Sequence, residues 1–185
     1  MSEPTALERL LLARSVQRGD FVLASGQRSS FYIDCRLSTM SAEGMVLVGK
    51  AGLAAIRSMR WEPNAVGGLT MGADPVAYAI AAASFGSSSP IDAFSVRKDA
   101  KQHGTRRRIE GNFRSGDRVV VVEDVITSGG SALQAIEAVT EAGGEIVGVL
   151  AVVDREQGGR GRIEASGHPV VSLTTSTRLG LPSGD

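Results

Sequence analysis

The sequence predicts an α/β domain built on a parallel sheet that is flanked by helices. Short apolar segments rich in β-branched residues alternate with segments whose apolar residues recur at helical spacing. Strands that alternate with helices pair in parallel, because each helix returns the chain across the sheet in a right-handed crossover. The 185 residues, 42% of them hydrophobic, suffice for one domain with a single core.

The N-terminal segment predicts a helix followed by a β-hairpin. Thr5 and Glu8 have the spacing of a capping box, so a helix should begin after Thr5 and run toward Gly19. Residues 21–24 and 31–36 have the composition of strands, and a polar turn with a glycine separates them. We expect the two strands to pair and the helix to cover part of the core.

The core elements follow in alternation. Apolar residues at helical spacing predict a helix over 41–59. Asp74 and Pro75 suit the N-cap and first position of the next helix, and Gly143 with Gly144 ends a later one. In chain order, we expect a strand at 65–69, a helix at 76–84, strands at 91–96 and 118–122, a helix through 133–139 and a strand at 145–153.

Charge and composition exclude several classes of function. Twenty Lys and Arg against twenty Asp and Glu give a formal net charge of zero, so no overall field would attract nucleic acid or an anionic membrane. No apolar run approaches the roughly 20 residues of a membrane span, and residues 1–5 do not resemble a secretion signal. The single cysteine, Cys35, is expected to be a half-buried thiol in a reducing compartment. We therefore expect a cytoplasmic protein that binds neither nucleic acid nor membranes.

Residues 119–131 are the most informative segment. Four valines lead into Glu123 and Asp124, and a turn of small residues then opens a helix. In open α/β sheets, ligands bind beyond the carboxyl ends of strands, where a helix N-terminus offers free amides to an anion. The amides of residues 128–131 could surround a phosphate monoester, and the hydroxyl groups of Thr127 and Ser131 could donate to it.

Glu123 and Asp124 suit another part of the ligand, because carboxylates repel phosphate. Their natural partners are hydroxyl groups or a divalent cation. A phosphate cradle beside two acids therefore suits a ribose 5-phosphate, although an ordinary glycine turn after an acidic strand end is the alternative. The P-loop pattern and a G-x-G-x-x-G after a strand are both absent, which argues against a Walker nucleotide hydrolase and a dinucleotide fold.

Residues 123–131 and the strand before them resemble the phosphoribosyl pyrophosphate signature of type I phosphoribosyltransferases. Four further stretches are similar to the orotate phosphoribosyltransferases of that family, so the likeness covers the chain from about Phe21 to Gly159; they are residues 25–29 with 31–34, 67–75, 97–104 and 154–156. The resemblance implies the type I phosphoribosyltransferase fold. It also implies one domain with an N-terminal hood (1–40) over the base site, an α/β core (41–175) and a mobile catalytic loop (97–112).

The activity implied by the resemblance is transfer of the phosphoribosyl group of 5-phosphoribosyl 1-diphosphate (PRPP) to orotate. The products would be orotidine 5′-monophosphate and pyrophosphate, a step of pyrimidine biosynthesis. Mg²⁺ would arrive with the substrate near Asp124, with no preformed metal site. Two alternatives stay open: a phosphoribosyltransferase for a purine or uracil, and a regulator that senses PRPP without catalysis.

The family's substrate contacts can be placed on this chain residue by residue. Catalysis would involve Lys101, Asp124 and His103, and we expect His103 to donate a hydrogen bond rather than act as a general acid. The residues implied to bind PRPP are Arg97, Lys98, Lys101, His103, Glu123, Asp124, Val125, Ile126, Thr127, Ser128, Gly129, Gly130 and Ser131.

The loop at 97–108 carries much of the expected positive charge, with six Lys or Arg and one Asp. It has few apolar residues to anchor it, so we expect a lid that orders over a polyanion, although for residues 106–108 we expect a solvated basic hairpin. In the resembling family this loop reaches into the neighbouring subunit. That likeness implies a homodimer with shared active sites.

Orotate and pyrophosphate would occupy two further subsites. The fork of Arg155 suits the orotate carboxylate, with Thr127, Tyr32 and Ile33 around the base. The loop that resembles the family's pyrophosphate loop consists of Thr70, Met71, Gly72 and Ala73. Some family members carry lysines where this chain has Ala24 and Gly72, so we expect Lys98 and Lys101 to supply more of the charge.

Overall fold

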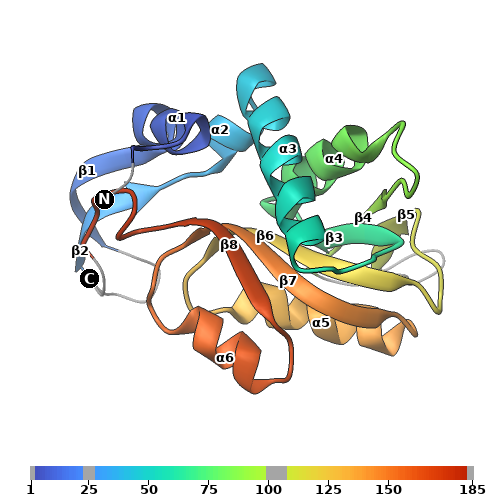
Figure 1. Cartoon of the computed structure of the whole chain (residues 1–185). Helices are drawn as coiled ribbons and strands as arrows, with labels where there is room; N and C mark the ends of the chain where they lie inside the picture. The colour runs from blue at the N-terminus through green and yellow to red at the C-terminus, as the bar shows by residue number, and fades with distance from the viewer. Residues whose placement is uncertain (1–2, 23–27, 99–107, 183–185) are drawn as a thin grey trace.

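The computed structural model describes residues 3–22, 28–98 and 108–182, which form a six-stranded sheet and a two-stranded sheet (Figure 1). The larger sheet has the strand order β5-β4-β3-β6-β7-β8, and all neighbours are parallel except β4 and β5. Its strands are β3 (Ala65–Leu69), β4 (Asp92–Val96), β5 (Ile109–Gly111), β6 (Arg118–Ile126), β7 (Glu145–Asp154) and β8 (Val170–Thr175). The predicted α/β class with a mainly parallel sheet is confirmed.

Helices cover both faces of this sheet (Figure 1). α3 (Ala42–Ser58) and α4 (Ala73–Ser84) lie on one face, and α5 (Gly130–Glu141) and α6 (Gly159–Ala165) lie on the other. Side chains of a strand point alternately to its two faces. In β6, Val120 and Val122 join the core under α3 and α4, whereas Val119 and Val121 join the core over α5. An unbroken run of valines is therefore what a strand buried on both faces needs.

The N-terminal elements lie beside one end of the sheet as a separate layer (Figure 1). They are α1 (Ala6–Arg14), β1 (Val16–Val22), β2 (Arg28–Ile33) and the short α2 (Arg36–Thr39), and β1 pairs with β2 antiparallel. The predicted pairing of two N-terminal strands is confirmed, although β1 begins at Val16 rather than Phe21 and β2 at Arg28 rather than Phe31. The capping box is confirmed as well, since the Glu8 amide donates to Thr5 Oγ1 at 3.2 Å and the Thr5 amide to Glu8 Oε2 at 2.7 Å. The helix ends at Arg14, however, because the chain passes at once into β1, and Gly19 lies within that strand.

Three further expectations about element bounds were wrong. The second hairpin strand ends at Ile33, and Arg36 begins a helical turn instead. α4 begins at Ala73, so Asp74 lies in its first turn and does not cap it. β6 continues beyond Val122 to Ile126, because residues 123–126 still pair with β7. The two acids of the phosphate segment are therefore held by a strand and not by a loop.

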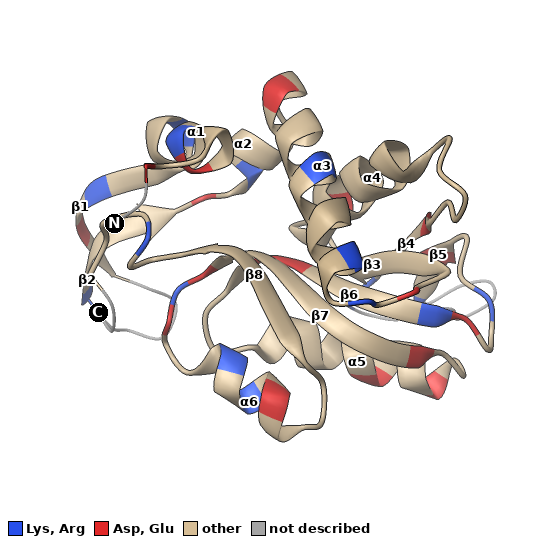
Figure 2. Cartoon of the chain, viewed as in Figure 1, with Lys and Arg blue, Asp and Glu red and all other residues tan. Residues whose placement is uncertain are grey.

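α6, β8 and the short β5 were not predicted. α6 has seven residues and follows Gly158 in a left-handed conformation with φ 84°, so its sequence reads as a glycine-rich loop. Cys35 is fully buried and not half-buried. No helix within the described residues is long and apolar enough to cross a membrane. Acidic and basic residues are interspersed over the helices and loops, in accord with the zero net charge (Figure 2).

Candidate active site

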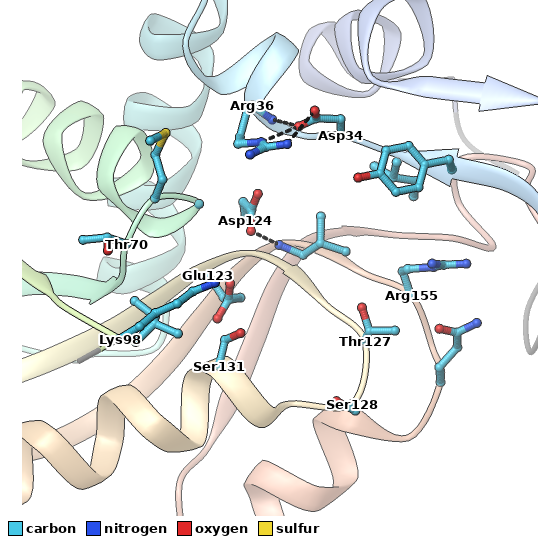
Figure 3. A pocket seen from close by; sticks show the side chains of 17 residues that line it. Asp34, Arg36, Thr70, Lys98, Glu123, Asp124, Thr127, Ser128, Ser131 and Arg155 are labelled. Atoms are coloured by element: carbon cyan, nitrogen blue, oxygen red, sulfur yellow. Dashed lines mark hydrogen bonds and ion pairs between the residues drawn. The ribbon is translucent and has the colours of Figure 1, made fainter. Parts of the chain in front are cut away.

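Four parallel strands end at one cavity of about 600 Å³. Thr70 follows β3, Lys98 follows β4, Thr127 follows β6 and Arg155 follows β7, and side chains of all four line the cavity (Figure 3). The N-terminal layer closes another side with Tyr32 to Asp34 and Arg36. The lining residues are Tyr32, Ile33, Asp34, Arg36, Leu69, Thr70, Met71, Gly72, Lys98, Glu123, Asp124, Val125, Thr127, Ser128, Ser131, Arg155 and Gln157.

A smaller hollow of about 70 Å³ opens beside it, at the N-terminus of α5. Glu123 and residues 125–131 line this hollow. Gly129 precedes the helix with φ 76°, and a Cβ at this position would lie 2.9 Å from the carbonyl oxygen of Gly159. The first amides of α5 have no acceptor within the helix and carry the positive end of its dipole. The hollow therefore offers free amides to an anion, in the segment where the sequence predicts a phosphate cradle.

Glu123 and Asp124 lie between this cradle and the rest of the cavity. Burial raises the pKa of Glu123 well above its usual range, and the adjacent Asp124 charge raises it further. Burial also raises the pKa of Asp124, whose Oδ1 accepts a hydrogen bond from the Val125 amide at 2.9 Å. Glu123 Oε2 is buried without a hydrogen-bond partner among the described residues. Two adjacent buried acids, one with an unpartnered oxygen, favour the binding of a cation or of hydroxyl donors.

These acids do not form a closed metal site. Within the described residues, no group of three or more His, Cys, Asp or Glu side chains could hold a metal ion. Oxygen ligands from a substrate would have to complete the coordination of a hard cation such as Mg²⁺, which commonly binds through one or two carboxylates and substrate phosphates. The unpartnered Oε2 of Glu123 fits such an ion.

The loop after β3 lies directly against Asp124. A Cβ on Gly72 would be 2.5 Å from Asp124 Oδ1, so the backbone itself approaches the carboxylate. Thr70 is fixed by its amide, which donates to the Val96 carbonyl at 2.8 Å. Thr70, Met71 and Gly72 line the cavity as predicted, whereas Ala73 is fully buried in α4 and does not line it.

At the opposite end of the cavity, Arg155 is buried with only 5% of its surface exposed. Its guanidinium lies 4.7 Å from the centroid of the Phe31 ring, and its Nη2 donates to Ser29 Oγ at 3.4 Å. Its Nε has no partner among the described residues, and burial lowers the pKa of the side chain. A buried planar cation held against a ring face has the geometry to bind a carboxylate.

Sequence reasoning missed three polar side chains of the cavity, namely Asp34, Arg36 and Gln157. The Arg36 guanidinium donates to Asp34 in a bidentate pair, from Nε at 2.8 Å and from Nη2 at 2.9 Å. The Asp-x-Arg spacing is visible in the sequence. Because the predicted strand extended through Arg36, no role was assigned to this residue. A helical turn after Ile33 places both side chains on the cavity instead.

Other predicted site residues lie elsewhere or outside the described chain. Arg97 does not line the cavity and approaches Glu110 at 3.6 Å. Ile126 is buried in the core and contributes only to the smaller hollow. Lys101 and His103 fall outside the described residues. Of the solvated basic hairpin expected at 106–108, residues 106 and 107 lie outside the described chain. Arg108 is half-buried rather than solvated, with its guanidinium 4.0 Å from the Glu141 carboxylate.

Residues 45–173 match the family model of the phosphoribosyl transferase domain. The orotate phosphoribosyltransferase of Aquifex aeolicus is 49% identical over 182 residues, which cover 97% of this chain and 98% of the relative. The Mycobacterium tuberculosis orotate phosphoribosyltransferase in complex with Fe(III) dicitrate superposes with a TM-score of 0.83 at 44% identity, covering 95% and 97% of the two chains. Its complex with PRPP gives a TM-score of 0.80 at 42% identity, with the same coverage.

Proposed function

Because the chain belongs to the orotate phosphoribosyltransferase family, we propose that its cavity binds PRPP and orotate through the groups described above. The reaction transfers the phosphoribosyl group of PRPP to orotate and yields orotidine 5′-monophosphate and pyrophosphate, a step of pyrimidine biosynthesis. Orotate N1 forms a bond to C1 of the ribose and loses its proton to the solvent, while the C1–O bond breaks and the electron pair of that bond leaves with pyrophosphate. The observation that carries the assignment of subsites is the convergence of four strand ends on one cavity.

The hollow at the start of α5 is assigned to the 5′-phosphate of PRPP. Its amides, the hydroxyl groups of Thr127 and Ser131 and the helix dipole all favour a dianion. Glu123 and Asp124 would then accept hydrogen bonds from the ribose hydroxyl groups. Charge that develops on the ribose as the C1–O bond breaks is positive, so two nearby carboxylates stabilise it.

Glu123 and Asp124 would also hold Mg²⁺ together with oxygens of the substrate. When bound there, the ion supplies positive charge that neutralises the diphosphate. The raised pKa values of both acids and the unpartnered Glu123 Oε2 support this assignment. The chain's own contribution is to hold the pair on a rigid strand, in register with β7.

Arg155 is assigned to the orotate carboxylate, at the end of the cavity away from Lys98 (Figure 3). Phe31 and Ser29 hold its guanidinium before the base arrives, so little side-chain freedom is lost on binding. Thr127, Tyr32 and Ile33 line the cavity around this position. An uncharged base offers no group for this buried cation, so Arg155 selects for orotate.

The diphosphate is assigned to the backbone of Thr70 to Gly72 and to Lys98. Lys101 and His103, outside the described residues, are proposed to neutralise the leaving pyrophosphate and to donate a hydrogen bond to it. Loss of Lys101 should then lower kcat strongly. A Lys101→Ala variant with unchanged steady-state kinetics would remove that role.

We further propose a cytoplasmic homodimer that shares its active sites. Leu37 and Met40 on or beside α2, with Val46 on α3, expose about half of their surfaces on adjacent elements. Exposed apolar side chains on two elements in contact favour association with a second copy of the chain. Mixing Lys101→Ala and Arg155→Ala chains tests the sharing of sites, because hybrid dimers would regain activity that neither variant has alone.

The proposed function is tested by incubating the protein with PRPP, Mg²⁺ and one base at a time. We expect loss of orotate absorbance and stoichiometric release of pyrophosphate with orotate, and no turnover with adenine, hypoxanthine or uracil. Turnover with a purine or uracil and none with orotate would contradict the assignment. Arg160→Ala, in an exposed pair with Glu164 on α6, is a suitable control variant.

A further inference from the structure

Arg36 presents a fixed guanidinium to the cavity. Asp34 accepts hydrogen bonds from the Nε and Nη2 atoms of Arg36 and, at 3.1 Å, from the Arg36 backbone amide. These bonds hold the Arg36 side chain at the start of α2. Two of the five guanidinium N–H groups are thereby used, and the other three have no hydrogen-bond partner among the described residues. Nearly half of the side chain is exposed, and it lines the cavity.

The cation lies across Asp124 from the phosphate cradle. In Figure 3, Arg36 and Asp34 stand on one side of Asp124, and Ser128 and Ser131 stand on the other. Arg36 and Asp124 line the same cavity. A sugar whose 5′-phosphate occupies the cradle and whose hydroxyl groups meet Asp124 therefore extends toward Arg36 with its C1 substituent.

This part of the cavity needs another cation. By formal charge, the lining cations Arg36, Lys98 and Arg155 equal the lining acids Asp34, Glu123 and Asp124 in number, so the lining has no formal excess of positive charge. Arg155 lies at the base end, and the loop of residues 70–73 has no basic side chain. Among the described residues, only Lys98 and Arg36 remain to meet a diphosphate, which brings several negative charges.

We propose that Arg36 is a diphosphate-binding residue, held by Asp34 so that its free N–H groups donate to the oxygens of the departing pyrophosphate. This proposal rests on the proposed function and adds a specific residue to it. A guanidinium suits the task because it stays charged and donates in a fixed fork to phosphate oxygens. The role of Asp34 is positioning, since it fixes the fork without meeting the anion.

The test compares two ligands of the whole protein in the presence of Mg²⁺. Titration calorimetry measures the affinity for pyrophosphate and for ribose 5-phosphate, which lacks the diphosphate. Arg36→Ala should weaken pyrophosphate binding and raise the KM for PRPP by about 10- to 100-fold, the range of a lost charge-assisted contact. Ribose 5-phosphate affinity and the KM for orotate should stay within about twofold. Arg36→Lys should recover part of the loss, because it keeps the charge and loses the fork.

Two further variants separate binding from a structural role. If Arg36 only neutralises Asp34, the double variant Asp34→Asn/Arg36→Ala should recover the pyrophosphate affinity, whereas a direct ligand predicts no recovery. Arg160→Ala removes a comparably exposed arginine pair, with a side chain 45% exposed against 46% for Arg36, and should change neither affinity.

The outcomes distinguish this proposal from the proposed function. Unchanged pyrophosphate affinity in Arg36→Ala, equal losses for both ligands, a rise confined to the KM for orotate, or recovery in the double variant would each overturn the role of Arg36. Failure of the unaltered protein to bind PRPP would instead overturn the proposed function. If Arg36→Ala unfolds, as thermal melting would reveal, the comparison of Arg36→Lys with the unaltered protein decides.

Discussion

The carboxylate of Glu8 accepts a hydrogen bond from the guanidinium of Arg178, with Glu8 Oε1 2.6 Å from Arg178 Nε, and so ties the first helix to the turn that follows the last strand. Arg178 Nη2 donates to Glu8 Oε2 at 3.0 Å, and Thr174 Oγ1 donates to Glu8 Oε1 at 2.8 Å. Only 2% of the Glu8 side chain is exposed. The same carboxylate closes the capping box of α1, so one side chain joins the N-terminal layer to the core sheet.

Replacing Glu8 by Gln should destabilise the fold and remove part of its acid sensitivity. The Arg178 contact lowers the pKa of Glu8 to about 2, below the value of about 4.3 expected in the unfolded chain. A carboxyl group whose pKa is lower in the folded protein stabilises the fold at pH values above its pKa in the unfolded chain. This contribution is lost as the pH falls toward 2. We expect Glu8→Gln to cost about 2 kcal/mol at pH 7 in urea titrations.

The pH dependence supplies the control for that prediction. The difference in free energy of unfolding between Glu8→Gln and the unaltered protein should shrink between about pH 5 and pH 2. Glu137→Gln, on an exposed position of α5, should show no difference at any pH. A Glu8→Gln difference that persisted unchanged at pH 2 would show that the carboxylate charge does not carry the stabilisation.

Glu123→Gln should have opposite effects on stability and activity. Burial raises the pKa of this carboxyl, so the folded protein retains a proton that the unfolded chain releases, and stability falls as the pH rises above the unfolded value. An amide of the same shape removes that cost. We expect the unliganded variant to be more stable by about 1–3 kcal/mol at pH 7, with kcat/KM for PRPP lowered by about 100-fold or more.

Thermal melting and steady-state assays measure both effects on the same preparation. One kcal/mol corresponds to a rise of about 2–4 °C in Tm for a chain of this size. Saturating PRPP with Mg²⁺ should stabilise the unaltered protein more than Glu123→Gln, because the ligand meets a charge only in the former. A Glu123→Gln protein with lower Tm and full activity would assign this side chain to the core and not to the substrate.

The fold was predictable from sequence wherever one local signal decided the element. The four valines of β6 and the Thr5–Glu8 capping box specify a buried strand and a helix start without reference to distant contacts. α6 and β8 carry no comparable signal, because α6 is short and glycine-rich and β8 is defined by its pairing with β7. The bounds of β6 also depend on a partner, since residues 123–126 are strand only through β7.

The site also divides into residues that a local segment specifies and residues that depend on distant contacts. The phosphate cradle lies within one continuous segment, so its residues could be named from spacing alone, and Arg155 was placed by the family resemblance. The contacts that orient Arg155 come from Ser29 and Phe31, more than a hundred positions earlier in the chain. Arg36 was missed because its role depends on a helical turn that brings it over Asp124. Contacts between distant segments are what the sequence pattern does not encode.

Gly129→Ala should damage both the fold and the phosphate site. Gly129 has φ 76°, and a Cβ there would lie 2.9 Å from the Gly159 carbonyl oxygen and 3.1 Å from Ile163 Cγ1. We expect a loss of about 2 kcal/mol or more from left-handed strain and overpacking. Because the clash displaces the cradle, ribose 5-phosphate affinity should fall by more than about tenfold.

Gly158 provides a matched control for that change. It also has a positive φ, 84°, but a Cβ at this position would meet no atom within 4 Å, so Gly158→Ala adds strain without a clash. We expect it to cost about 1–2 kcal/mol in stability and to leave ribose 5-phosphate affinity within about twofold. Equal ligand affinities for the Gly129 and Gly158 variants would place the phosphate elsewhere.

Arg155→Ala should separate recognition of the base from recognition of PRPP. Truncation removes the carboxylate receptor at the base end and leaves the cradle and the acids in place. We expect the KM for orotate to rise by about 100-fold or more, while the pyrophosphate affinity changes by less than about threefold. Arg155→Lys should recover little, because an ammonium group cannot donate in a fork while stacked on Phe31.

Ser29→Ala tests whether that guanidinium must be held in advance. It removes one acceptor of the Arg155 Nη2 group and leaves the charge, so the KM for orotate should rise by a smaller factor, about three- to tenfold. The affinity for pyrophosphate again serves as the internal reference. An Arg155→Ala protein that lost orotate and pyrophosphate binding equally would mean that Arg155 supports the cavity as a whole, and selection for the carboxylated base would then have to reside in another residue.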